Sequence, residues 1–318
     1  MHPASRATGV PLVLLAASLW ATVGVAAQLV PAASEFPPEI LGFARTAIAG
    51  PVLLLVAIIV PGPKAIRLTR LNPAGLVVFA TSNAIFQIGL FRCFAILGVT
   101  VTVYLTVCLP PLMAMVWNWL RQRESVGVGN VLALAHAVTG LWLIGHGFAF
   151  GGTGMPSSEG IVMAIIASLA FVTMTDAART LGRTEPPLLI TGAGLTLSSA
   201  LLLLTLPVIG VASLSVMTAA LGDPTILGLA IYLGLGPTAL AYVCYCAGIA
   251  RCRSVLVGLI ASMIEPAIAA VLAISILSDK PSMAEAVGCS LLMIAILILW
   301  QSERGLARRR IEAASAAS

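Results

Sequence analysis

The sequence carries little charge. Charged residues make up 9% of the 318 positions, whereas hydrophobic residues make up 59% and the mean hydropathy is +1.06. A soluble domain carries about 25% charged residues, so this chain cannot cover itself with a polar surface. The deficit excludes a soluble globular protein and indicates a protein that crosses a membrane several times.

The motifs of several functional classes are also missing. The six cysteines form no Cys-x-x-Cys pair, and His136 and His146 have no ligand partners at metal spacing, so no metal site is expected. No phosphate-binding loop is present, which disfavours an ATP-driven pump. No nucleophile–base or paired-carboxylate arrangement appears, so we expect neither an enzyme nor a cofactor. The net charge of +5 is dispersed between apolar runs, which argues against nucleic acid as a partner.

About ten apolar runs of membrane-spanning length divide the chain. They are 9–30, 39–60, 73–94, 99–120, 126–147, 159–178, 187–210, 226–249, 254–277 and 282–300. Lipid offers no partner to an open backbone, so a run of about 20 apolar residues is expected to be a helix. The first run exceeds twenty residues, which favours a retained helix over a cleaved signal peptide. The predicted fold class is an all-α integral membrane protein.

The basic residues predict the orientation. With the N-terminus inside, fourteen lysines and arginines fall in inner loops and the inner tail, and Lys280 alone falls outside. The positive-inside rule then places both termini in the cytoplasm, and we expect a bacterial cytoplasmic (inner) membrane.

Two matching stretches indicate an internal repeat. Residues 100–124 and 255–279 align with Pro111 over Pro266, and Ala17-Ser18-Leu19 recurs at positions 167–169. Five helices per half is an odd number, so the two halves should enter the membrane from opposite sides as inverted repeats. Helix kinks are expected at Pro110, Pro111 and Pro266.

The predicted domain organisation follows from this repeat. It comprises a cytoplasmic N-terminus (1–8), a first five-helix repeat (9–147), an outer linker (148–158), a second five-helix repeat (159–300) and a basic cytoplasmic tail (301–318).

The order and spacing of several short motifs carry a family resemblance. They are Leu19-Trp20-Ala21-Thr22-Val23-Gly24, Arg45, Leu109-Pro110-Pro111-Leu112 with Glu124, Glu265-Pro266-Ala267 and Leu277-Ser278-Asp279. On these the chain resembles the drug/metabolite transporter superfamily, in its ten-helix branch with two EamA-type domains. It departs from the family pattern at Asp279, where glutamate is usual, and at Trp20-Ala21, where Trp-Gly is common. The resemblance implies a transporter, in a family largely of exporters of amino acids and other small metabolites.

Glu265 is the strongest candidate for a functional site residue. It lies halfway along the 254–277 run, where an ionised carboxylate is costly unless it faces a wet cavity, pairs with a cation or stays protonated. It is therefore a candidate coupling group for a proton or cation, or a partner for a substrate ammonium. The structural alternative is that a protonated Glu265 satisfies a carbonyl freed by Pro266.

Polar residues on repeat-equivalent helix faces are candidates for lining a central cavity. Asn83 and Gln87 lie four residues apart in the third run, and the 155-residue offset places Thr238 and Tyr242 at the matching positions. Tyr245 extends the same face, while Tyr104 and Trp20 are candidates from the fourth and first runs. The alternative is that these polar groups serve as hydrogen bonds between helices.

Arg45, in the outer half of the second run, is a candidate gating or substrate-carboxylate contact. Snorkelling toward the surface, or pairing with an outer acid, is the alternative.

Together these features predict a secondary transporter that exports small metabolites such as amino acids by alternating access. The expected partners are a small-molecule substrate, the lipid bilayer and a proton or another ion. An importer or exchanger is the alternative within transport. A non-transporting integral membrane protein, whether an enzyme or a structural subunit, is the alternative from another class. The oligomeric state is left open.

Overall fold

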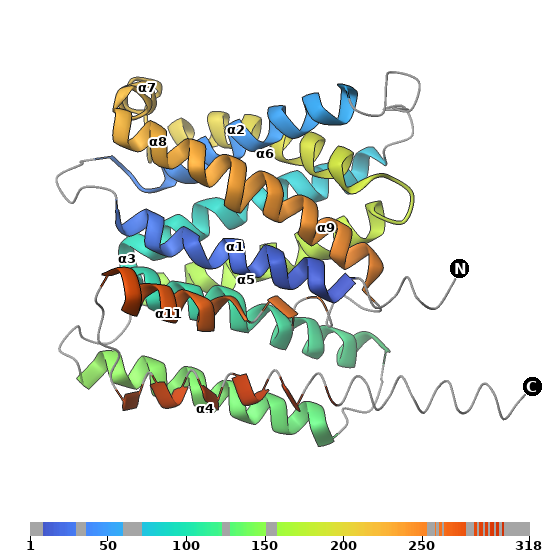
Figure 1. The fold of residues 1–318 in the computed structure, drawn as a ribbon, viewed down its shortest axis with the longest axis vertical. Helices are drawn as coiled ribbons and strands as arrows, with labels where there is room; N and C mark the ends of the chain where they lie inside the picture. The colour runs from blue at the N-terminus through green and yellow to red at the C-terminus, as the bar shows by residue number, and fades with distance from the viewer. Residues whose placement is uncertain are drawn as a thin grey trace, which may run out of the picture.

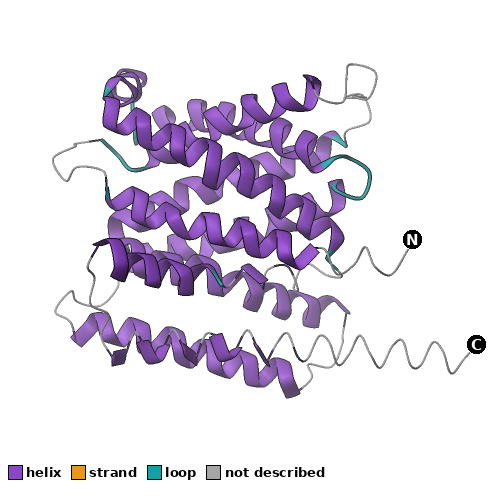
Figure 2. Ribbon diagram, in the orientation of Figure 1, coloured by secondary structure: helices purple, strands orange, loops and turns teal. Residues whose placement is uncertain are grey.

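The computed structural model describes residues 9–29, 36–59, 72–122, 128–150, 158–252 and 264–277, with shorter pieces between 258 and 301. These residues form helices joined by turns and contain no strand (Figure 2), which confirms the all-α fold class. The N-terminus (1–8), the centre of the outer linker (151–157), Glu124, Asp279 and the tail beyond Gln301 lie outside the described residues.

Most of the described residues lie in helices (Figure 1). In chain order they are α1 (Gly9–Gln28), α2 (Glu39–Ile59), α3 (Pro73–Gln122), α4 (Val128–Phe150), α5 (Ser158–Leu181), α6 (Pro187–Val208), α7 (Leu214–Gly222), α8 (Pro224–Leu233), the π-helical η3 (Gly234–Leu240), α9 (Ala241–Arg251) and α11 (Glu265–Leu277). Six of the predicted runs are confirmed as helices long and apolar enough to cross a membrane: Gly9–Ala27, Glu39–Ile59, Pro73–Leu97, Ser158–Leu181, Pro187–Val208 and Pro224–Arg251. Val131–Gly140 and Ala286–Ala295 are shorter apolar helices in two further runs.

One short helix was not expected from the sequence. The segment after α6 turns at Gly210, whose φ of 73° suits glycine, and then forms α7. The Ser213 hydroxyl caps α7 by accepting from the Val216 amide, and Asp223 caps α8 by accepting from the amides of Thr225 and Ile226.

Helix α3 contains both the third and the fourth predicted runs, and it does not run straight. A Cβ on Gly89 would lie 2.9 Å from the Cβ of Ala167, and the Ser168 hydroxyl donates to the Leu105 carbonyl at 3.4 Å. Sixteen residues of straight helix would place Gly89 and Leu105 about 24 Å apart, yet both lie beside neighbouring residues of α5. The chain therefore reverses between them, as two successive membrane spans require.

One contact between the two halves is made by α2 and α6, which are equivalent helices of the two repeats. A Cβ on Gly50 would collide with the backbone of Leu195 and Thr196, and a Cβ on Gly192 would collide with the backbone of Leu53 and Leu54. Residue numbers thus rise along α2 as they fall along α6, so the two helices are antiparallel. Equivalent helices that run in opposite directions are what an inverted repeat produces.

Two further contacts between the halves are equivalent to each other: each one becomes the other when the two repeats are interchanged. Helix α1 packs antiparallel to α9, where a Cβ on Gly9 would lie 2.7 Å from the Gly248 carbonyl oxygen. The equivalent pair is α3 with α5, also antiparallel, since Gly75 meets Leu181 at one end and Leu97 meets Gly160 at the other. Each half therefore packs on the other through matching helices, and the space between them becomes the centre of the molecule.

The close approach of α2 and α6 predicts a sharp difference between two glycines. We expect Gly192→Ala to lower the thermal unfolding midpoint by a few degrees, because its Cβ would lie 2.5 Å from the Leu54 amide nitrogen, which cannot move aside alone. Gly228→Ala is the matched control: it lies in α8 with nothing within 4 Å, so alanine should be neutral or stabilising. Unfolding of the purified protein in detergent measures both, and equal midpoints would contradict this packing.

Candidate functional site

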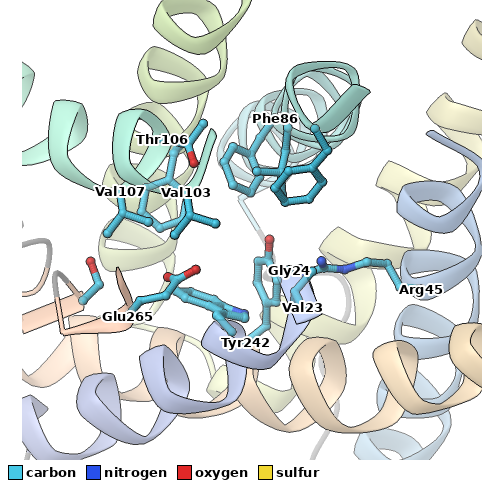
Figure 3. Close-up of a pocket in the computed structure, with 14 residues that line it drawn as sticks. Val23, Gly24, Arg45, Phe86, Val103, Thr106, Val107, Tyr242 and Glu265 are labelled. Atoms are coloured by element: carbon cyan, nitrogen blue, oxygen red, sulfur yellow. The ribbon is translucent and has the colours of Figure 1, made fainter. Parts of the chain in front are cut away.

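A cavity lies between the two halves of the bundle (Figure 3). It holds about 530 Å³ of unfilled space, counting the open space at its mouth. Its walls come from α1, α2, α3, α5, α9 and α11, together with Ser262: Trp20, Val23, Gly24, Arg45, Phe86, Leu90, Phe94, Val103, Thr106, Val107, Phe171, Tyr242, Ser262 and Glu265. Most of these side chains are apolar, so the few polar ones determine how a solute would be oriented.

Arg45 enters the cavity from α2. Its side chain is only 2% exposed, and its Nε donates a hydrogen bond of 2.9 Å to the Thr238 hydroxyl. The guanidinium carbon lies 6.0 Å from the centre of the Phe91 ring, within reach of a cation–π contact. Its Nη1 is buried and has no hydrogen-bond partner among the described residues. Arg45 therefore points inward, which excludes the snorkelling alternative.

Thr238 holds Arg45 because the helix is irregular at that point. Pro237 has no amide hydrogen, so the carbonyl of Leu233 loses its usual partner four residues on. The Thr238 hydroxyl donates to that carbonyl at 2.6 Å and at the same time accepts from Arg45. The surrounding segment forms the π-helical turn η3, an irregularity often found at functional sites.

Tyr242 is positioned by a buried polar network. The amide nitrogen of Asn83 donates to the Tyr242 hydroxyl at 2.9 Å and lies 3.3 Å from the sulfur of Met174. The Ser198 hydroxyl donates to the amide oxygen of Asn83, also at 2.9 Å. Helices α3, α5, α6 and α9 thus meet at one asparagine, and the Tyr242 hydroxyl is directed toward the cavity (Figure 3).

Aromatic contacts fix Trp20 beside Tyr242. The Trp20 ring packs edge-on against Tyr242 and Phe171, with ring centres 5.3 and 5.9 Å away, and tilted against Tyr245 at 4.9 Å. The Tyr245 hydroxyl shares a 2.8 Å hydrogen bond with Thr175. Tyr245 does not line the cavity; it supports Trp20, which does.

Three further candidate substrate-binding residues, Asn83, Gln87 and Thr238, do not line the cavity. Asn83 and Thr238 act through Tyr242 and Arg45, as described above. The side chain of Gln87 is 1% exposed. A Cβ on Gly42 would lie 3.6 Å from the Cβ of Gln87, so Gln87 faces α2 about one turn before Arg45. Tyr104 lies in α3, and its side chain is outside the described part of the chain. The structure thus brings Trp20, Arg45, Tyr242 and Glu265 together at the cavity. Asn83, Thr238 and Tyr245 contact Tyr242, Arg45 and Trp20 from outside it.

Glu265 faces Arg45 from the opposite wall of the cavity (Figure 3). It is the first residue of α11, because the ninth predicted run is broken by a turn at Ile264. Pro266 occupies the first turn, where a helix tolerates its missing amide hydrogen. Pro110 and Pro111 lie inside α3 and are buried. A membrane-spanning run that is broken beside the cavity is the arrangement by which many transporters build ion and substrate sites.

A second group of charges lies at the end of the bundle where α2 and α5 begin. The guanidinium of Arg92 lies 4.0 Å from the Glu39 carboxylate and 3.6 Å from that of Glu159. Arg92 is half exposed whereas Glu39 is buried, so this residue of α3 joins the starts of two helices from different halves. The sequence alone did not predict this role for Arg92.

Sequence reasoning also missed the apolar walls and the supporting hydroxyls. Phe86, Phe94 and Phe171 are indistinguishable in the sequence from lipid-facing residues of the same runs. Ser198 and Thr175 gave no signal, because serine and threonine in apolar helices commonly bond to their own backbone. The repeat offset offered the one usable clue, since it paired Gln87 with Tyr242 and Asn83 with Thr238.

A helical bundle of this length and apolarity, with a buried arginine and an acidic residue lining an interior cavity, is typical of a polytopic membrane protein. A family model described as "EamA-like transporter family" matches residues 7–145 and 158–301. The chain belongs to the EamA-like transporter family and is a membrane transporter of the drug/metabolite type.

A solved crystal structure supports the fold. It superposes with a TM-score of 0.70 over 92% of this chain and 97% of its own length, at 18% sequence identity. No curated protein matches the chain by sequence.

The link between Arg45 and η3 yields a stability prediction. Thr238→Val removes the hydroxyl that bonds to both Arg45 and the Leu233 carbonyl. We expect the free energy of unfolding to fall by about 1–3 kcal/mol and the unfolding midpoint to fall with it. Thr238→Ser keeps the hydroxyl and should stay close to the wild type. Thermal unfolding in detergent compares the three proteins, and a valine variant as stable as the serine variant would show that neither hydrogen bond matters.

Proposed function

We propose that this protein is a secondary transporter that exports small metabolites, amino acids first among them, across a bacterial cytoplasmic membrane by alternating access. The observation that carries the proposal is the cavity between the two halves, which contains Arg45 and Glu265 on opposite walls. An ionisable side chain inside a membrane bundle is expensive and is usually retained for a substrate or ion pathway. Membership in the EamA-like transporter family supports the same function.

The inverted packing of the halves supplies a means of alternation. The contacts of α1 with α9 and of α3 with α5 are equivalent under exchange of the repeats. If each half adopts the other's conformation, the same contacts re-form in mirrored order and the cavity opens toward the other side. The pairing of α2 with α6 maps onto itself under this exchange and serves as the pivot.

The distribution of charge along the bundle supports the proposed orientation. The start of α1 at Gly9 lies against Arg251 at the end of α9, so these residues share one end of the bundle. The acidic residues Glu39 and Glu159 open α2 and α5 at the opposite end, together with Arg92. Placing the end with Gly9 and Arg251 in the cytoplasm satisfies the positive-inside rule.

Glu265 is the proposed coupling group. Its carboxylate can hold a proton or pair with a cationic substrate, but one carboxylate cannot hold both at full strength. A proton released on one side and taken up on the other would then drive the substrate in the opposite direction. Arg92, which joins the starts of α2 and α5 to α3, would close one end of the pathway in this conformation.

The coupling proposal predicts a change in pH dependence. Glu265→Gln cannot gain or lose a proton, so proteoliposomes containing it should show no acceleration of amino acid flux by a pH gradient. Glu185→Gln, in the turn before α6, is the matched control and should keep the response of the wild type. Flux of radiolabelled phenylalanine and leucine, measured with and without the gradient, tests this. A Glu265→Gln variant with a wild-type pH response would refute the coupling role.

A further inference from the structure

Three residues that line the cavity carry a hydrogen-bond donor that no acceptor among the described residues occupies. The Nη1 of Arg45 and the Nε1 of Trp20 are buried and have no hydrogen-bond partner within the described part of the chain. Both residues are more than nine-tenths buried, at 2% and 7% exposure, and both line the cavity. Buried donors without an acceptor destabilise a protein, so their retention at one site calls for a ligand that supplies the acceptor.

The Tyr242 hydroxyl completes the set. A tyrosine hydroxyl can accept one hydrogen bond and donate another. Its accepting position is occupied by the amide nitrogen of Asn83, which is itself fixed by Ser198. The hydroxyl hydrogen of Tyr242 is thereby left to donate, and the side chain lies between Arg45 and Glu265 in the cavity (Figure 3).

Arg45 forms no close ion pair with a carboxylate of the described residues. Ion pairs in the described residues involve Arg92 with Glu39 and Glu159, and no carboxylate lies within 4.0 Å of Arg45. Glu265 lines the same cavity but stands on the opposite wall (Figure 3). One hydrogen bond from the Arg45 Nε to Thr238 and the contact with the Phe91 ring hold the guanidinium on its own wall of the cavity. The fold therefore holds a basic and an acidic side chain on opposite walls of a largely apolar cavity.

We infer that Arg45, Tyr242 and Trp20 form a carboxylate-binding subsite and that Glu265 receives the cationic end of the same solute. This inference rests on the proposed transport function and specifies its substrate as a dipolar ion with an apolar part. The free Nη1 of Arg45, which is charged, and two neutral donors suit the two oxygens of a carboxylate. The apolar wall of Phe86, Val103 and Phe171 suits an aliphatic or aromatic side chain.

A set of three related probes tests the subsite. They are phenylalanine, phenylalaninamide, which lacks the carboxylate, and 3-phenylpropionate, which lacks the ammonium; leucine, leucinamide and 4-methylpentanoate form a second set. Binding to the full-length protein in lipid nanodiscs is measured by calorimetry. We expect at least one amino acid to bind the wild type about tenfold or more tightly than either of its analogues, since each analogue leaves one buried charge without its partner.

Variants assign each charge to its end of the solute. Arg45→Gln should lose the preference for the amino acid over its amide, and Glu265→Gln should lose the preference over the deaminated acid. Tyr242→Phe keeps the ring and is expected to fold. It should weaken the binding of the amino acid and of the deaminated acid severalfold and leave the binding of the amide unchanged. Equal binding of amino acid and amide to the wild type would overturn the subsite, as would failure of both amino acids to bind. A Tyr242→Phe variant that weakens all three probes alike would also overturn it.

Transport separates this inference from the proposed function. If the binding pattern holds but proteoliposomes do not move the amino acid, the subsite stands and the transport proposal fails. If proteoliposomes move the amino acid and its amide equally, and Tyr242→Phe changes neither flux, transport stands and the subsite fails.

Discussion

Polar groups inside an apolar bundle must find their partners on other helices, because lipid supplies none. This constraint determines the centre of the structure. Arg45 of α2 is held by Thr238 of η3, and Asn83 of α3 joins Tyr242 of α9 to Ser198 of α6. Each hydrogen bond connects one half of the chain to the other, so the network that satisfies these groups also sets the walls of the cavity.

Irregular backbone lies where this polar centre needs it. The π-helical turn η3 places Thr238 toward Arg45, and the break before α11 places Glu265 on the opposite wall. Membrane proteins tolerate such breaks where protein or a cavity, rather than lipid, surrounds them. Regular close packing lies elsewhere, at the glycine contacts of α2 with α6 and of α1 with α9. Rigid contacts between halves and irregular segments at the cavity together suit a transporter that rocks without unfolding.

The sequence predicts the outline of the fold better than its site. Length and apolarity mark a membrane span because the bilayer has a fixed thickness. The 155-residue offset paired Asn83 with Thr238 and Gln87 with Tyr242, whereas the structure joins Asn83 to Tyr242. The sequence did not distinguish residues that line the cavity from residues that support them. Asn83 and Tyr245 lie behind Tyr242 and Trp20. Four-residue spacing shows which face of a helix is polar but not which side chains cover that face. Phe86 and Phe171 were not predicted, because an apolar side chain looks the same toward a cavity as toward lipid. Helix α7 was missed because its nine residues are too short for the span criterion.

The central claim is that one cavity between two inverted halves opens in turn to each side of the membrane. Thr106 lines that cavity, whereas Ala164 is fully buried outside it. Cysteine placed at each position in a cysteine-free background can be challenged with a membrane-impermeant thiol reagent from either side of sealed vesicles. The account predicts that Thr106→Cys is labelled from both sides and that Ala164→Cys is labelled from neither. A transport-active Thr106→Cys protein that reacts from one side only, or from neither, would contradict it.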